Sequence, residues 1–330
     1  MKRTALIVLT ALVALAAAPG YKVLDKIKIG GGGGWDYVYI DSDASRLYVS
    51  HTNQTEVIDT ATNKLVGTIP DTMGVHGIAI ASDLGKGFTS NGRANNVTIF
   101  DLKTLMATGK VDTGMNPDAI LYEPGSHRLF TFNGRSKDAT VIDAKAGTVI
   151  ATLPVGGKPE FAQYDGKGKV YFNVEDTSEI VELDAAKAAI TKRIKLAPCE
   201  EPSGLAIDRQ KRRLFAVCSN KLMAVVDPDA GKVLATLPIG TGADGAAFDN
   251  GFAFSSNGGD GTMTVVQETS AGKFEVVETV QTARTARTMG ADPKTHKLYL
   301  PAAEQGPPPA GGKGRGTIVP DSFHVMVVGR

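Results

Sequence analysis

The stretch TEVIDTATNKLVGTIP, residues 55–70, recurs along the chain at a nearly constant interval. Its clearest copies are VTIFDLKTLMATGKV (97–111), ATVIDAKAGTVIATLPVG (139–156), EIVELDAAKAAITKRIKL (179–196) and LMAVVDPDAGKVLATLPIG (222–240). Aligned on the central aspartates (Asp59, Asp101, Asp143, Asp184 and Asp227), successive copies lie 42, 42, 41 and 43 residues apart. A weaker sixth copy, centred on Gln267, follows 40 residues later. A repeat of about 42 residues is the size of one propeller blade.

A second element shares this period and supplies the other half of each unit. Pairs of alternating apolar runs joined by a polar turn occur seven times, as in YVYIDSDASRLYVSH (37–51), AILYEPGSHRLFTFN (119–133) and MGADPKTHKLYLPAA (289–303). Pro-Gly, Asp-x-x-Gly and Pro-x-Thr centres are typical of β-hairpin turns. No long segment has a helical apolar period. The sequence therefore predicts an all-β fold, a seven-bladed β-propeller of four-stranded blades.

The two ends of the chain predict how the ring closes. The seventh unit lacks a last strand, whereas YKVLDKIKIG (21–30) resembles a last strand with no blade before it. We expect this N-terminal strand to complete the seventh blade, which removes an exposed sheet edge. The glycines of GGGGG (30–34) are followed by WDYVYID (35–41), a strand pattern rather than the helix that a phosphate loop requires. We interpret them as a crossing loop between the last and first strands of neighbouring blades.

The repeat signature, with hairpins such as RLYVSHTN (46–53), resembles the YVTN-repeat β-propeller family, including its YncE-like and surface-layer-type exported members. The resemblance covers residues 21–330 and extends to WD40-like repeats in general. It implies that the first strand of each blade lines the central axis. One such scaffold serves many functions, so the resemblance implies fold rather than activity.

The N-terminus has the pattern of an export signal. A basic start, an apolar run from Thr4 to Ala16 and small residues near a cleavage point at 16–18 predict a cleaved signal peptide over 1–18. The alternative is an uncleaved membrane anchor, which the shortness of the apolar run disfavours. Residues 19–330 then form one propeller domain in the periplasm or outside the cell, without a membrane span and as a monomer. Removing Lys2 and Arg3 changes the formal charge from +1 to −1, which disfavours binding to nucleic acid.

Function is expected at the mouth of the central channel, where the residues before each inner strand converge. The predicted set is Asp36, His76, Asp118, Glu160, Glu201, Asp244 and Arg287. Carboxylates held close together raise one another's pKa and favour a cation or a cationic ligand. Carboxylate and imidazole ligands at this mouth could hold a divalent cation, although the identity of any metal stays open. The alternative is a set of solvated side chains without a ligand.

Three further features stand out. The turns SNGR (90–93) and FNGR (132–135) place Asn91, Arg93, Asn133 and Arg135 on adjacent outer loops. The Asn-Gly pairs are explained by turn geometry, whereas the two arginines could bind a carboxylate or phosphate.

The segment AAEQGPPPAGGKGRGTIVPDSF (302–323) inserts about ten extra residues into a loop of the last blade. Its proline and glycine content predicts an irregular, mobile segment. It is either a lid or partner contact, or a tolerated insertion without a function. Cys199 and Cys218 can form one disulfide, the alternative being two reduced thiols.

Three functional hypotheses follow. The first is an exported, non-catalytic binding or scaffold propeller that uses the mouth face for a small ligand or a protein partner, with no cofactor predicted. The second is a metal-dependent hydrolase resembling lactonases of propeller fold, with the acidic mouth as its site. The third, which rests on the resemblance alone, is an accessory protein of periplasmic quinoprotein redox chemistry. The sequence favours the first, because no residue pattern matches a known catalytic motif.

Overall fold

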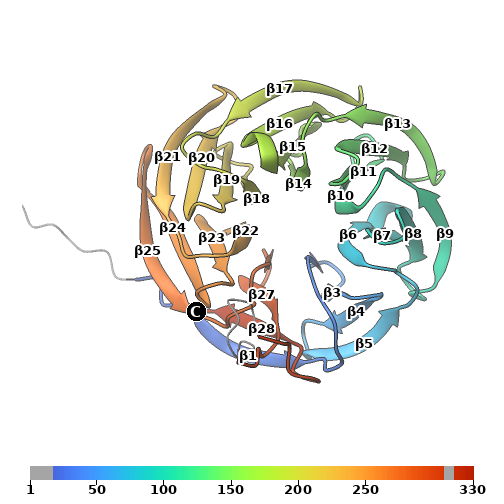
Figure 1. Ribbon diagram of the computed structural model, residues 1–330, viewed down its shortest axis with the longest axis horizontal. Coiled ribbons are helices and arrows are strands. Elements are labelled where there is room, and N and C mark those ends of the chain that lie inside the picture. The colour runs from blue at the N-terminus through green and yellow to red at the C-terminus, as the bar shows by residue number, and fades with distance from the viewer. Residues whose placement is uncertain (1–17, 308–315) are drawn as a thin grey trace, which may run out of the picture.

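Seven four-stranded sheets form a closed ring in the computed structural model, which describes residues 18–307 and 316–330 (Figure 1). All neighbouring strands are antiparallel, and in six sheets the strands follow one another in chain order. We call the strands A to D from the axis outward. The predicted all-β, seven-bladed propeller is confirmed, and its hairpins and repeated segments correspond to the A–B and C–D strand pairs.

The blades are numbered in chain order, and their strands are given from A to D. Blades 1 and 2 contain β2 (Val38–Asp41), β3 (Arg46–His51), β4 (Gln54–Asp59), β5 (Lys64–Ile69), β6 (Val75–Ala81), β7 (Lys86–Asn91), β8 (Asn96–Asp101) and β9 (Ala107–Asp112). Blades 3 and 4 contain β10 (Pro117–Glu123), β11 (Arg128–Asn133), β12 (Asp138–Asp143), β13 (Thr148–Pro154), β14 (Pro159–Tyr164), β15 (Lys169–Val174), β16 (Glu179–Asp184) and β17 (Ala189–Lys195). Blades 5 and 6 contain β18 (Pro202–Asp208), β19 (Arg213–Cys218), β20 (Leu222–Asp227), β21 (Lys232–Pro238), β22 (Ala243–Asp249), β23 (Phe252–Asn257), β24 (Thr262–Ser270) and β25 (Lys273–Gln281). Blade 7 contains β26 (Gly290–Asp292), β27 (Lys297–Ala302), β28 (His324–Gly329) and β1 (Lys22–Lys28).

Within residues 18–307 and 316–330, helix is confined to two single 3-10 turns, Ser82–Leu84 and Glu175–Thr177. Across the described ranges no helix has both the length and the hydropathy needed to cross a membrane. The predicted signal peptide lies almost entirely in residues 1–17, outside the described residues.

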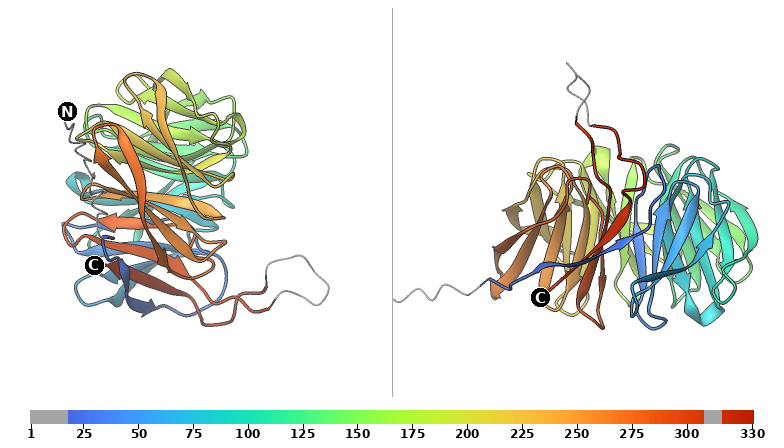
Figure 2. Two further views of the ribbon diagram at one scale, coloured as in Figure 1. Left: turned by 90° about the vertical axis from the view of Figure 1, so that its left-hand side faces the viewer. Right: turned by 90° about the horizontal axis from the view of Figure 1, so that it is seen from below.

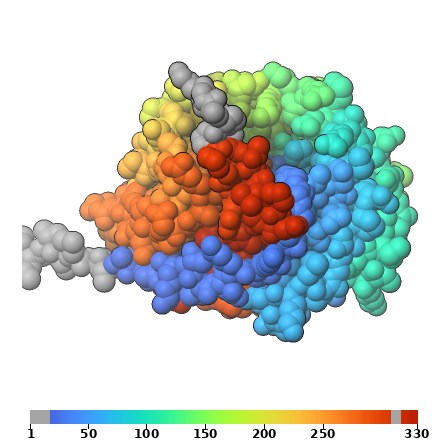
Figure 3. All heavy atoms as spheres, turned by 60° about the horizontal axis from the view of Figure 1, so that its bottom comes forward, coloured from blue at the N-terminus to red at the C-terminus, as the bar shows by residue number. Residues whose placement is uncertain are grey.

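The N-terminal strand closes the ring. β1 pairs with β28 from Lys22 opposite Gly329 to Lys28 opposite His324, so it is the outer strand of the last blade. Figure 3 shows this first segment, in blue, lying directly against the red C-terminal blade. The backbone groups of β28 are therefore paired on both sides, with β27 and with β1. This confirms the prediction that the N-terminal strand completes the seventh blade.

The aspartates that define the repeat stabilise the turns between C and D strands. In five blades the Oδ1 atom of the repeated aspartate accepts a hydrogen bond from the backbone N–H three residues later, at 2.8–3.0 Å. Blade 6 has Gln267 at this position, and its C and D strands, β24 and β25, are longer than those of the other blades. The most regular residue of the repeat is therefore a turn cap, a structural role typical of aspartate.

The core lies between neighbouring blades, where the alternating apolar residues of facing strands pack together. Between blades 3 and 4, the buried rings of Phe132 and Phe172 lie 4.7 Å apart at their centroids. Along the axis the A strands enclose a cavity of about 740 Å³, lined by side chains such as Tyr37, Ile78 and Phe161. The packed blades fix the directions of the side chains at the beginning of each A strand.

Candidate functional site

The beginnings of the A strands bring one side chain from each blade to the mouth of the axis. In blades 2 to 6, the first A-strand residue pairs with the last B-strand residue, and the next residue occupies the mouth position. Blades 1 and 7 contribute the equivalent residues just before β2 and β26. We call this set the mouth ring; its members are Asp36, His76, Asp118, Glu160, Ser203, Asp244 and Arg287.

Six of the seven predicted mouth residues are in this ring, and Glu201 is not. Pro202 pairs with Cys218, as Pro117 pairs with Asn133, so Ser203 is the residue equivalent to Asp118. Glu201 lies on the exposed crossing loop, where its carboxylate accepts a hydrogen bond from the Ser219 hydroxyl at 2.8 Å. The prediction that Glu201 belongs to the mouth ring was wrong, because Glu201 was chosen for its acidic side chain. Pro202 begins the strand and pairs with Cys218, so the ring position is the residue after it.

The first part of the ring joins a histidine to two carboxylates. The His76 Nδ1 atom lies 2.6 Å from Asp36 Oδ2 and 3.7 Å from Asp118 Oδ1. The side chains of Asp36 and Asp118 are only 12% and 14% exposed, so water screens their charges weakly. Burial alone lowers the pKa of His76, but the hydrogen bond to Asp36 and the charges of both carboxylates raise it overall. Burial, followed by the charge of Asp36, raises the pKa of Asp118 to about 7.

The second part of the ring is held by an arginine. Arg287 forms an ion pair with Asp244, and its Nη2 atom lies 3.5 Å from Asp36 Oδ1. The same Nη2 donates a hydrogen bond of 2.8 Å to the carbonyl oxygen of Trp35, which fixes the guanidinium between blades 1 and 6. Burial raises the pKa of Asp244, and Arg287 only partly offsets this.

The third part is an ion pair between Lys158 and Glu160, which the sequence pattern did not predict. Lys158 Nζ lies 2.7 Å from Glu160 Oε1 and also pairs with Glu175. On the other side, the Tyr37 hydroxyl donates a hydrogen bond of 3.4 Å to Glu160 Oε2. Burial and the charge of Asp118 raise the pKa of Glu160 to about 9 although Lys158 lowers it. The Lys-Pro-Glu order of residues 158–160 is the signal that could have placed Lys158 beside the ring.

Carboxylates outnumber permanent cations in the ring and its attached lysine. Four carboxylates (Asp36, Asp118, Glu160 and Asp244) face two permanent cations (Arg287 and Lys158), with His76 as a third cation when it is protonated. Burial first, and then the charges of neighbouring carboxylates, raise the pKa values of Asp118, Glu160 and Asp244, so bound protons take up part of this excess near neutral pH. A cationic group, or a metal ion bound by Asp36, His76 and Asp118, would relieve it. The ligand atoms of these three residues all lie within 4.8 Å of one another.

The outer-loop asparagines are structural. Asn133 is fully buried at the end of β11, where its amide nitrogen donates to Asp138 and Thr140 and its oxygen accepts from Thr131. Asn91 makes the same kind of contacts in blade 2. Each asparagine joins the B strand to the C strand, a role different from the turn position predicted for it. Arg93 and Arg135 are exposed and form no ion pair with any described residue.

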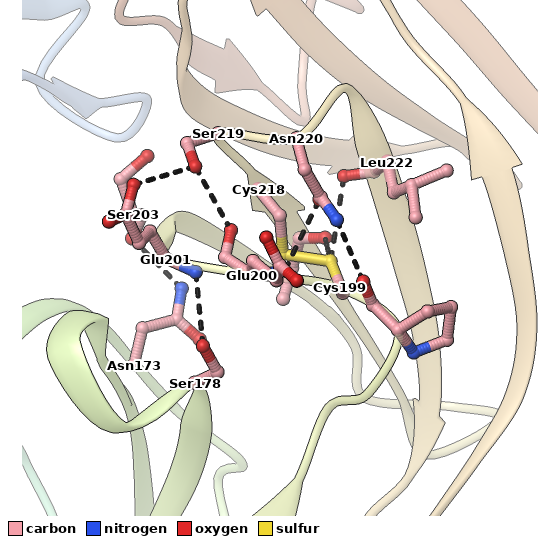
Figure 4. The surroundings of a disulfide bond; sticks show 12 residues. Asn173, Ser178, Cys199, Glu200, Glu201, Ser203, Cys218, Ser219, Asn220 and Leu222 are labelled. Carbon is pink, nitrogen blue, oxygen red and sulfur yellow. Dashed lines mark hydrogen bonds between the residues drawn. A yellow bond between two sulfur atoms is a disulfide. The ribbon is translucent and has the colours of Figure 1, made fainter.

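Cys199 and Cys218 form a disulfide, with their Cα atoms 5.8 Å apart. It links the crossing loop of blade 5 to the end of β19, and both cysteines are buried (Figure 4). Nearby, the Asn220 amide donates a hydrogen bond of 2.7 Å to the carbonyl of Pro198. These contacts hold the loop that carries Glu201.

The insertion of the last blade connects β27 to β28, on the same face as the mouth ring. Its described arms run antiparallel, with Gln305 bridged to Ile318 and Gly306 N–H donating to the Thr317 carbonyl at 2.8 Å. Figure 2 shows the two arms, in red, leaving one face of the ring. Apart from this isolated bridge the described arms contain no strand or helix, which agrees with the expectation of an irregular segment, while 308–315 lie outside the described residues.

Comparison with solved structures finds other propellers. One chain of Kuenenia stuttgartiensis hydrazine synthase aligns with a TM-score of 0.70 and 14% identity over 89% of this chain and 95% of its own. The structures of U3-55K and of the RRP9 WD40 repeats align with TM-scores of 0.73 and 0.74, each at 10% identity over 94% of this chain and 99% of theirs. Such low identities establish the fold alone.

No family model matches the chain, and no curated protein matches its sequence. The resemblance to the YVTN-repeat family therefore stays a prediction. The WD40 structures nevertheless agree with the repeat architecture.

Proposed function

We propose that this protein is an exported, non-catalytic binding propeller that holds a cationic group at its mouth ring. The group belongs to a small ligand or to a protein partner. The observation that carries this proposal is the excess of carboxylates over permanent cations, held in fixed positions by strands from different blades. Such a frame changes little on binding, so little conformational entropy is lost.

The contacts of the ring favour binding over catalysis. His76, Arg287 and Lys158 are each engaged with ring carboxylates, so the basic groups are occupied in maintaining the arrangement. A cationic ligand needs no proton transfer from them; it needs only an unbalanced carboxylate, and Asp118 Oδ1 is buried without a hydrogen-bond partner among the described residues. Export is part of the proposal because of the pattern of residues 1–18.

Native mass spectrometry on protein exported through its own signal and purified without chelator tests the proposal. We expect additional bound mass, or binding of added Zn²⁺, Ca²⁺ or spermidine, that is weakened in Asp118→Asn and Glu160→Gln. Asp112→Asn, which removes an exposed carboxylate from the outer strand of blade 2, is the matched control. Retention of the bound mass in both ring variants would contradict the proposal, as would a chain that binds none of the added cations.

A second candidate function is a metal-dependent hydrolase. It is favoured by one observation, the convergence of one imidazole and two carboxylates from Asp36, His76 and Asp118 within 4.8 Å. Such a set could hold a divalent cation that activates water. Hydrolysis of a lactone that depends on added metal and disappears in Asp36→Asn would replace the binding function with this one.

A further inference from the structure

The insertion of the last blade forms one wall of a pocket beside the mouth ring. The pocket has a volume of about 900 Å³, and all of its lining belongs to the described residues. The arms of the insertion form one side through residues 303–306, Gly316 and Ile318, and the Gly258–Gly259 loop with Arg284 forms another. Trp35 and His324 also line it. This volume is in the range of pockets for small organic ligands.

Trp35 presents an unused hydrogen-bond donor. Its side chain is buried, with the residue 8% exposed, and its indole stacks on Phe323 with the ring centroids 5.1 Å apart. The indole Nε1–H is buried and has no acceptor among the residues that the structure describes, although Trp35 lines the pocket. Because buried N–H groups are nearly always paired in native proteins, a ligand acceptor is a physical explanation for this one.

His324 presents the complementary acceptor. Its residue is 9% exposed, and its Nδ1 atom lies 2.8 Å from the carbonyl oxygen of Ser322. Since a carbonyl can only accept, Nδ1 carries the hydrogen, and in the neutral ring Nε2 is left as an acceptor. That Nε2 is buried and has no partner within the described ranges.

The charges of the lining favour an acid. Lys26 and Arg284 line the pocket against one carboxylate, that of Glu304, while Arg287, which also lines it, is already paired with Asp244. The Arg284 guanidinium is exposed and forms no ion pair with a described residue. An arginine in this setting binds a carboxylate through two parallel hydrogen bonds. Apolar side chains such as Ile318 complete the lining.

We propose that this pocket binds a small organic acid with a hydroxyl or ammonium group beside its carboxylate and an apolar or aromatic remainder. Arg284 and the Trp35 Nε1–H take the carboxylate. The Nε2 atom of His324 and the Glu304 carboxylate accept from the hydroxyl or ammonium group. This site goes beyond the mouth ring: it takes the opposite charge, and none of its four binding groups belongs to the ring, so either proposal can fail without the other.

The pocket carries its own reporter, because Trp35 is the only tryptophan in the chain. Fluorescence and calorimetric titrations use four probes that differ in one group: L-3-phenyllactate, L-phenylalanine, 3-phenylpropionate and L-phenylalaninol. We expect at least one of the first two to bind with a change in Trp35 emission. Loss of the donor, in phenylpropionate, or of the carboxylate, in phenylalaninol, weakens binding about 10-fold or more.

The variant Arg284→Gln is expected to weaken binding of the acids about 10-fold to 100-fold, because a charge-assisted pair is lost. Lys110→Gln, which removes an exposed cation from β9 in blade 2, far from the pocket lining, is the matched control and leaves binding unchanged. Tighter binding of phenyllactate or of phenylalanine tells which donor the pocket prefers. The inference is overturned if neither binds up to its solubility limit, if Arg284→Gln binds as the unmodified protein does, or if phenylpropionate binds equally well.

Discussion

Asp118→Asn should stabilise this protein at high pH, which is unusual for a change at a polar site. Folding raises the pKa of the Asp118 carboxyl from its ordinary value of 3.8 to about 7, chiefly through burial and then through the charge of Asp36. The folded state therefore binds this proton more tightly than the unfolded state does. The free energy of unfolding falls as the pH rises from about 4 to about 7, and the loss is complete above that range.

The size of the effect follows from the two pKa values. At about 1.4 kcal/mol per pH unit, the interval from 3.8 to about 7 corresponds to about 4 kcal/mol of lost stability at high pH. Asparagine has nearly the same shape as protonated aspartate and cannot ionise. We therefore expect wild type and Asp118→Asn to be about equally stable at pH 4 and the variant to be more stable at pH 8 by up to about 4 kcal/mol.

Urea unfolding at a series of pH values measures this difference directly. Asp112→Asn, an exposed carboxylate on β9, is the control for removing one negative charge. If Asp118→Asn is equally stable or less stable than wild type at pH 8, Asp118 is well compensated in its ionised form. The excess of negative charge at the mouth ring would then be refuted, together with the binding function built on it.

Three further predictions concern the frame. Cys199→Ala combined with Cys218→Ala opens a loop of 19 residues and should lower the free energy of unfolding by about 3 kcal/mol in urea; an unchanged midpoint would show that the hydrogen bonds of the crossing loop suffice. Asn133→Ala removes hydrogen bonds to two threonines and Asp138 and should cost about 3 kcal/mol in the same assay, whereas the exposed Arg135→Ala should cost almost nothing. Deleting residues 18–28 leaves β28 as an unpaired edge and should cause concentration-dependent association by light scattering; a stable monomer would mean that closure by β1 is dispensable.

The fold could be predicted almost completely because its determinants are local and repeated. A period near 42 residues, seven hairpins and an unmatched strand at each end determine the number of blades and the closure by β1. What could not be predicted was the role of the regular residues. The repeated aspartates cap turns and the buried asparagines tie two strands together, and both roles depend on backbone positions that the sequence alone does not display.

The site was predicted less well because it depends on register between blades. Placing Glu201 in the mouth ring put it two residues too early, and Ser203 holds the equivalent position. Lys158 was not predicted because its ion pair with Glu160 depends on the course of the crossing loop and is not part of a sequence motif. The pocket beside Trp35 was missed altogether, since it joins segments from both chain ends and from blade 6.

Comparison of the repeats with one another separates scaffold from specificity in this chain. Positions that keep the same residue from blade to blade, such as the capping aspartate, satisfy backbone groups that every blade has. The mouth position is occupied by Asp, His, Asp, Glu, Ser, Asp and Arg in successive blades, although the backbone there is equivalent. Since the fold places no common demand on these side chains, what they share is only their convergence on the axis. Their charges are therefore the part of the repeat in which this propeller differs from a generic one, and the mouth ring is where substitutions should change binding without changing the fold.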